Sequence, residues 1–198
     1  MINWEERYSK EGDVEQYDWY ISGSKLAPLL VPLTLPDDEI LYVGCGKSDL
    51  GAELSKRKRK FVTNIDSSKR VIRTMSNIYS EFEDMQFVEM DVLKMPQDLD
   101  QAFQLVIDKA LLDYFLCEVN VDKAMKYLTE IKRVIKPGGH FCVVSHGIPE
   151  NRVPLLVSAF SLPNSTRIKI SKLPKPEVEE DIPIGADSYY FLYTVRAG

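Results

Sequence analysis

The sequence predicts an α/β fold, in which a mostly parallel, doubly wound sheet of seven strands ends in an antiparallel hairpin. Two observations point to this fold. From residue 39 to residue 146, apolar runs of strand length alternate with segments of helical period, which is typical of a parallel sheet covered by helices on both faces. After residue 146, the runs "STRIKISKL" and "SYYFLYTVRA" are β-rich and are joined by a polar segment, which indicates an antiparallel pair.

Residues 1–38 precede this alternation and contain both tryptophans of the chain. The run "SKLAPLLVPL" within them predicts a short apolar helix that is broken at Pro32. We expect this segment to pack on the sheet as an N-terminal cap. The first residues are charged where a signal peptide would be apolar, and no stretch approaches the roughly 18 apolar residues of a membrane span. We therefore expect a protein of the cytoplasm, or alternatively of the nucleus, that does not bind membranes.

Residues 39–146 are expected to form the core of the fold. The strand candidates are residues 39–43, 60–65, 85–90, 103–108 and 140–145, and the helix candidates are residues 49–58, 67–82 and 122–136. In the last helix, one face carries Ala124, Tyr127, Leu128, Ile131 and Ile135. The sequence "KPGGHF" predicts the end of that helix, with Lys136 in its last turn and the glycine pair reversing the chain.

Residues 147–198 are expected to contain a helix followed by the β-hairpin. The acidic run "EVEED" (177–181) between the hairpin strands predicts a solvated loop, with a docking rim for a basic peptide as the alternative. At 198 residues, the chain is expected to fold as a single domain.

The composition excludes some functions. The formal net charge is −5, whereas a protein that binds nucleic acid through its phosphates needs a clustered basic face. We therefore expect no nucleic-acid partner, and a basic partner fits the charge better. The three cysteines are an odd number without a CxxC spacing, so that neither a disulfide framework nor a metal site is suggested.

A glycine loop, "ILYVGCGKSDLG", follows the first strand and could hold one of several cofactors. A triphosphate-binding P-loop would need a glycine at position 41, which is Leu41. A dinucleotide loop would need its third glycine at position 49, and the carboxylate of Asp49 would repel a pyrophosphate. Gly44 and Gly46 remain, and they allow the backbone to approach a ligand that has no phosphate.

Two acidic residues follow the next two strands at the same edge of the expected sheet. Asp66 ends the second strand, where a carboxylate can accept both hydroxyls of a ribose, and Asp91 follows the third. Taken alone, each could be a helix N-cap. Because ligands of such sheets bind at the carboxyl ends of the strands, we expect Gly44, Asp66 and Asp91 to line one crevice.

A nucleoside site of this kind, in a parallel sheet that ends in an antiparallel hairpin, resembles the class I S-adenosylmethionine-dependent methyltransferases, whose fold is Rossmann-like. The sequence departs from the general pattern at Tyr42, where an acidic residue is usual, and at Ser48, where a glycine is usual. Both departures are found in the methyltransferase-like 13 group, which includes lysine methyltransferases of translation elongation factor 1A. The chain is similar to that group in five segments: "WEERY" (4–8), "YDWY" (17–20), "GCGKS" (44–48), "DKALLDY" (108–114) and "YYFLYT" (189–194).

The resemblance implies that the cofactor is S-adenosylmethionine and the product S-adenosylhomocysteine. The loop with Gly44, Cys45 and Gly46 would approach the methionine part of the cofactor. The resemblance also assigns its other contacts: the ribose to Asp66 with Ser67 beside it, the adenine to Asp91 beside Val92, the closure of the site to Trp4, Tyr8 and Trp19, and a position near the cofactor to Lys109.

The segment after the fourth strand faces the methyl acceptor in such enzymes. It lacks the "[DN]PP[YF]" signature of amide and base-amine methyltransferases, and no Pro-Cys pair supplies the nucleophile of a cytosine C5 enzyme. A lysine acceptor is protonated at neutral pH and must lose a proton. Our hypothesis is that carboxylates and a phenol orient this ammonium and ease its deprotonation: Asp108, Asp113 and one of Tyr114, Tyr189 or Tyr190.

Three functions remain open from the sequence. The first is a protein-lysine methyltransferase whose partner is a protein with an accessible lysine, such as elongation factor 1A. The others are a small-molecule methyltransferase of the same fold and a non-catalytic module that binds S-adenosylmethionine. Neither histidine has an acidic partner at a useful spacing, and His146, near the end of the fifth strand, is the one that could touch a substrate. The sequence does not define the oligomeric state.

Overall fold

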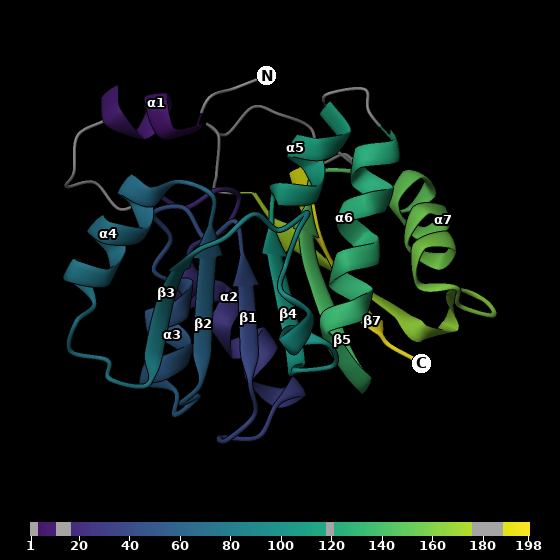
Figure 1. Cartoon of the computed structure of the whole chain (residues 1–198). Helices are drawn as coiled ribbons and strands as arrows, with labels where there is room; N and C mark the ends of the chain where they lie inside the picture. Colours follow the sequence, from purple (N-terminus) through teal and green to yellow (C-terminus); the bar gives the residue numbers. More distant parts are fainter. Residues whose placement is uncertain (1–3, 11–16, 118–120, 176–187) are drawn as a thin grey trace.

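The computed structural model describes residues 4–10, 17–117, 121–175 and 188–198. Its centre is one seven-stranded sheet in the order β3-β2-β1-β4-β5-β7-β6 (Figure 1). The strands are β1 (Ile40–Val43), β2 (Val62–Asp66), β3 (Met85–Glu89), β4 (Phe103–Lys109), β5 (Ile135–Ser145), β6 (Ile168–Pro174) and β7 (Tyr189–Arg196).

The pairing of the strands confirms the predicted fold class. Strands β1 to β5 pair parallel with one another, and β7 pairs antiparallel with both β5 and β6. The strand order reverses between β1 and β4. In open α/β sheets, ligands bind at the carboxyl ends of the strands at this switch point.

Helices cover both faces of the sheet, and Figure 1 shows α6 and α7 on the near face and α2 and α3 behind it. Along β1, the alternate residues Ile40 and Tyr42 belong to one apolar cluster, and Leu41 and Val43 belong to the other, as the two-residue period of a strand requires. The helices are α1 (Trp4–Lys10), α2 (Gly23–Leu30), α3 (Leu50–Lys56), α4 (Lys69–Ile78), α5 (Leu111–Cys117), α6 (Val121–Val134) and α7 (Pro149–Phe160), with the 3₁₀ turns η1 (Val31–Leu33), η2 (Gln97–Leu99) and η3 (Ser165–Arg167).

The predicted end of the helix before β5 is wrong. Helix α6 buries the expected face of Ala124, Tyr127, Leu128 and Ile131, but it ends at Val134, and β5 begins before the glycine pair. The reason lies in the pairing with β4, in which the register shifts irregularly between Phe103 and Leu105. The residues of "KPGG" therefore belong to an irregularity inside the strand, where Gly138 has a φ of 76°, and do not form a helix stop.

The N-terminal segment contributes α1, α2 and η1. Leu26, Ala27 and Leu30 of α2 are fully buried in the apolar cluster that contains Ile40 and Tyr42 of β1. Helix α5, which directly follows β4, was not predicted. Residues 177–181, expected to be a solvated loop, lie outside the described residues. Within the described part of the chain, no helix has both the length and the apolarity needed to cross a membrane.

Candidate functional site

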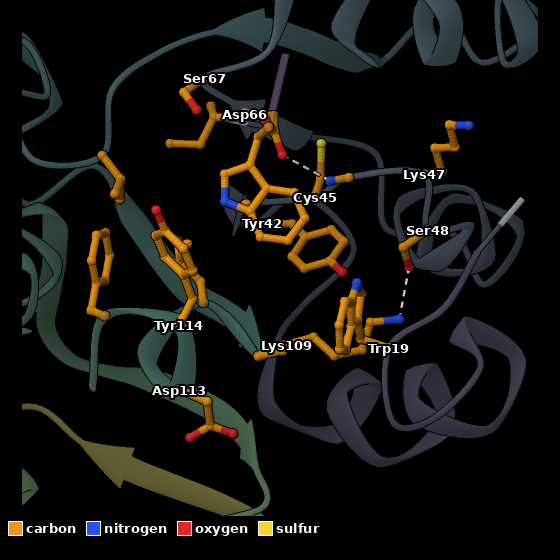
Figure 2. A pocket seen from close by; sticks show the side chains of 18 of the residues that line it. Trp19, Tyr42, Cys45, Lys47, Ser48, Asp66, Ser67, Lys109, Asp113 and Tyr114 are labelled. Atoms are coloured by element: carbon orange, nitrogen blue, oxygen red, sulfur yellow. Dashed lines mark hydrogen bonds between the residues drawn. The ribbon is translucent and has the colours of Figure 1, made fainter. Parts of the chain in front are cut away.

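A cavity of about 510 Å³ lies at the carboxyl ends of the central strands, a size that is typical of small-molecule sites. Its wall is formed by the N-terminal segment, the glycine loop, the ends of β2 and β4, the turn after β3, and α5 (Figure 2). Around it lie all the residues that the sequence assigned to a cofactor: Trp4, Tyr8, Trp19, Gly44, Cys45, Gly46, Asp66, Ser67, Asp91, Val92 and Lys109.

The glycine loop brings backbone amides to the floor of this cavity. Gly44 and Gly46 have φ angles of 59° and 51°, a left-handed conformation that glycine adopts without steric cost. A Cβ atom added to Gly44 would lie 3.0 Å from the Leu111 side chain, so the residue keeps the loop against the start of α5. The Gly46 amide donates a hydrogen bond to Asp66 Oδ2 at 3.0 Å, and the Ser68 amide donates to Oδ1 at 2.9 Å.

Asp66 is nearly buried at the end of β2. Burial raises the pKa of its carboxyl, whereas hydrogen bonds from the amides of Ser68 and Gly46 oppose that shift. The Ser67 amide also interacts with this carboxylate, which has about four lone-pair positions in all. Acceptor capacity therefore remains for a hydroxyl group of a ligand.

The turn after β3 supplies the next part of the wall. Asp91 Oδ1 accepts the amide of Leu93 at 2.9 Å, which holds the turn in place, and Val92 is largely buried beside it. Ser67 lies next to Asp66 and is exposed (Figure 2). Asp66 and Ser67 lie at the end of β2, and Asp91 and Val92 lie after the neighbouring strand β3, so the two pairs lie side by side at the carboxyl edge of the sheet.

Lys109 joins the N-terminal segment to the glycine loop. Its ammonium pairs with Asp18 and donates hydrogen bonds to the Ile21 carbonyl at 3.1 Å and to Ser48 Oγ at 3.0 Å. An ammonium has three N–H donors, so these three acceptors satisfy it. Burial lowers the pKa of Lys109, and the charge of Asp18 opposes that shift. Lys109 therefore positions the residues that line the cavity and has no donor left for a cofactor.

Aromatic rings surround the opening of the cavity, as Figure 2 shows for Trp19 and Tyr114. Trp4 lies edge-on to Tyr114 with 5.6 Å between ring centroids. The guanidinium carbon of Arg7 lies 5.1 Å from the Trp4 ring and 5.6 Å from the Trp19 ring. This rim already holds a cation between two indole faces, an arrangement that favours positively charged groups.

Asp108 does not line the cavity, which contradicts the hypothesis that it orients an acceptor. Its side chain is fully buried and accepts the amides of Leu111 and Leu112 at 2.7 and 2.8 Å and the Tyr127 hydroxyl at 2.7 Å. Burial raises the pKa of Asp108 to about 7, and the Tyr127 hydroxyl opposes that shift. Asp108 thus anchors the start of α5 beneath the cavity.

Asp113 lies on the side of the cavity opposite Asp66 (Figure 2), and its carboxylate is enclosed by hydrogen-bond donors. Oδ1 accepts from Ser145 Oγ at 2.5 Å and from the Arg152 guanidinium at 2.9 Å. Oδ2 accepts from the Tyr20 hydroxyl at 2.8 Å and from the His146 amide at 2.9 Å. These bonds leave little room for direct contact with an acceptor, so Asp113 acts through its neighbours.

The structure also brings together residues that the sequence did not. His146 Nδ1 lies 2.8 Å from Asp113 Oδ2 and 3.0 Å from the Tyr20 hydroxyl, which corrects the expectation that His146 has no acidic partner. His146 directly follows β5 and lines the cavity. The rule that placed Asp66 and Asp91 at the carboxyl edge of the sheet applies to His146 as well, and Tyr20 belongs to the "YDWY" segment.

The three candidate tyrosines have different positions. Tyr114 lines the cavity, whereas Tyr189 and Tyr190 do not. The Tyr190 ring packs against Tyr20 in a tilted arrangement, with 4.5 Å between centroids, and so supports the tyrosine that reaches Asp113. Among the described residues, no group of histidine, cysteine or acidic side chains could hold a metal ion.

Residues 35–177 match the model of a family described as "Methyltransferase domain". The chain is 35% identical over 146 residues to the eEF1A lysine and N-terminal methyltransferase of Xenopus laevis, in a match that spans 72% of this chain and 21% of the relative. It is 30% identical over 161 residues to EEF1A lysine methyltransferase 4 of Mus musculus, spanning 76% of this chain and 62% of the relative. The match thus covers less than two thirds of either relative.

Two solved structures show the same fold. The N-methyltransferase NodS from Bradyrhizobium japonicum, in complex with S-adenosylhomocysteine, superposes with a TM-score of 0.60 at 15% identity, covering 87% of this chain and 86% of that one. The 1,6-didemethyltoxoflavin-N1-methyltransferase from Burkholderia thailandensis, which also contains S-adenosylhomocysteine, gives 0.65 at 15% identity, covering 88% and 76%.

Proposed function

The chain belongs to the methyltransferase domain family, and on that premise we propose that it transfers a methyl group from S-adenosylmethionine to a lysine side chain of a protein, such as elongation factor 1A. The cofactor follows from the family and from the ligands of its structural neighbours. The choice of a protein lysine as the methyl acceptor goes beyond the family assignment and is the part that we propose. The proposal places the reaction in the cytoplasm, where translation takes place.

The residues around the cavity fit S-adenosylmethionine. Asp66 retains acceptor capacity for the ribose hydroxyls beside the amides of Gly46 and Ser68 that it binds. The positive φ angles of Gly44 and Gly46 bring the backbone close to the ligand. When bound, the cofactor supplies a methyl group on a positively charged sulfur, an activated leaving group that makes positioning a large part of catalysis.

A single observation carries the choice of a lysine acceptor: the aromatic rim of the cavity holds a cationic side chain. Arg7 lies over the rings of Trp4 and Trp19, and a lysine ammonium that takes the place of Arg7 at these rings would meet the same attraction. The formal net charge of −5 favours encounter with a basic protein segment. The two relatives described above are named for methylation of eEF1A, which supports the same choice.

Labelled S-adenosylmethionine, added with the purified protein to a cell lysate, tests this proposal. The expected result is a labelled protein band at the mass of elongation factor 1A, with the label on lysine after acid hydrolysis. Asp66→Ala serves as the inactive control. Label confined to small molecules would contradict a protein acceptor, and binding without any transfer would contradict catalysis.

A further inference from the structure

The contacts of His146 define which of its ring nitrogens carries the proton. Nδ1 faces two groups, the Asp113 carboxylate at 2.8 Å and the Tyr20 hydroxyl at 3.0 Å. The carboxylate can only accept, and the single proton of the Tyr20 hydroxyl is already donated to Asp113 at 2.8 Å. Nδ1 must therefore be the donor, and in the neutral ring Nε2 is the basic nitrogen.

Asp113 is held in a fixed orientation for this contact. The Arg152 guanidinium and Ser145 Oγ occupy Oδ1 and leave Oδ2 for Tyr20 and His146. The absence of a side chain at Gly147 leaves room for the Arg152 guanidinium beside Asp113, because a Cβ atom at position 147 would lie 2.3 Å from the guanidinium carbon. The His146 side chain is 49% exposed, whereas that of Asp113 is 4% exposed. The arrangement therefore has a buried carboxylate, ion-paired with Arg152 through Oδ1, behind an imidazole that reaches the cavity and the solvent.

We propose that His146 is the general base that removes a proton from the acceptor ammonium, with Asp113 and Tyr20 as positioning residues. This inference rests on the proposed function, because only a protonated amine needs such a base. The ammonium N–H bond breaks, the proton forms a new bond to Nε2, and the electron pair stays on the amine nitrogen as the nucleophile. The imidazolium then releases its proton to solvent through its exposed side.

The surroundings of His146 suit this role. Around the His146–Asp113 pair, Arg152 comes from α7 and Tyr20 from the N-terminal segment, where the tilted ring of Tyr190 packs on it. Asp108 of β4, Tyr193 of β7 and Glu150 of α7 add further titratable groups near Asp113 and Arg152. Arg152 is bonded to the opposite carboxylate oxygen from His146. A negative charge thus lies directly behind the imidazole, where it stabilises the imidazolium that forms.

The first test is the tautomer of His146 in the native protein. The chain has two histidines, so ¹⁵N imidazole spectra contain two ring systems, and His140→Gln assigns them. The expected result above neutral pH is a protonated Nδ1 and a bare Nε2 on His146. A proton on Nε2 in the neutral ring would overturn the proposal without any activity measurement.

The second test compares the pH profiles of methyl transfer to elongation factor 1A. His146→Gln should lower kcat about 100-fold at pH 7 while the Kd for S-adenosylmethionine stays within twofold of wild type. The deficit should narrow toward pH 10, where lysine loses its proton to solvent. His140→Gln, within β5 and outside the cavity, should behave as wild type.

The outcomes distinguish a failure of the His146 assignment from a failure of the proposed lysine methyltransferase function. Equal kcat for wild type and His146→Gln, with an active wild type, overturns the base assignment alone. A wild type that binds S-adenosylmethionine and labels no protein overturns the proposed function, and the base assignment with it.

Discussion

Lys109 at the end of β4 forms a buried ion pair with Asp18, which lies 91 residues earlier in the chain. Removing one partner of such a pair leaves the other charge unpaired and costs more than removing both. Asp18→Asn should therefore lower the free energy of unfolding by about 3 kcal/mol, and the double variant Asp18→Asn, Lys109→Met should recover part of that loss. Chemical denaturation measures the free energy of unfolding of each variant. If the losses from the two single substitutions simply add in the double variant, the two charges are not coupled.

The same pair should control cofactor affinity, because it holds the N-terminal segment beside Ser48 of the glycine loop. Both single variants and the double variant should bind S-adenosylmethionine at least about tenfold more weakly in calorimetry, a loss of ~1.4 kcal/mol. Recovery of stability without recovery of affinity would distinguish this positioning role from a general effect on folding.

Asp66→Ala should abolish binding of S-adenosylmethionine, with the Kd raised about 100-fold or more, since both ribose hydroxyls lose their acceptor. The protein should remain folded, because burial already disfavours the charged form of Asp66. The exposed Asp84 is the matched control, and Asp84→Ala should bind as wild type does. Unchanged affinity of Asp66→Ala would exclude the assigned ribose contact.

Glycine variants test the loop. Gly44 and Gly138 both have positive φ angles, but an added Cβ meets the Leu111 side chain at 3.0 Å only at Gly44, and nothing within 4 Å at Gly138. Gly138→Ala should cost about 1 kcal/mol of stability from backbone strain and leave cofactor binding intact. Gly44→Ala should cost more and weaken binding, as thermal unfolding with and without S-adenosylmethionine would show.

Asp108 predicts a pH dependence of stability. Its pKa is about 7 in the folded protein and about 3.9 in an unfolded chain. A carboxyl whose pKa is raised on folding contributes stability at low pH that is lost as the pH rises through about 4 to 7. The stability of wild type relative to Asp108→Asn should fall across this window, by at most about 1.4 kcal/mol per pH unit. If the difference in stability between wild type and Asp108→Asn does not change with pH, the raised pKa of Asp108 is contradicted.

The cofactor side of the cavity could be predicted from the sequence because it depends on strand ends. Gly44, Asp66 and Asp91 each lie at or just after the end of a strand of one parallel sheet, so that the strand pattern alone places them together. The side chains that hold them could not be predicted. The Lys109 contact with Asp18 depends on how the N-terminal segment crosses the sheet, and no local pattern encodes that path.

The acceptor side was predicted less well for a similar reason. Asp108 lies near the end of β4 and Asp113 lies in the first turn of α5, which begins at Leu111. The chain thereby places the Asp108 carboxylate under the helix and the Asp113 carboxylate beside Ser145 of β5. The partners of Asp113 come from three other elements, among them Tyr20 at a separation of 93 residues. Such a cluster is defined by packing, whereas a strand end can be recognised from a periodic pattern.

The most direct measurement is peptide mass spectrometry of purified elongation factor 1A after incubation with the protein and isotopically labelled S-adenosylmethionine. Transfer to a specific lysine by the wild type, and none by Asp66→Ala, is the predicted result. An elongation factor that carries no label after incubation with a wild-type protein shown to bind S-adenosylmethionine would contradict its assignment as the acceptor.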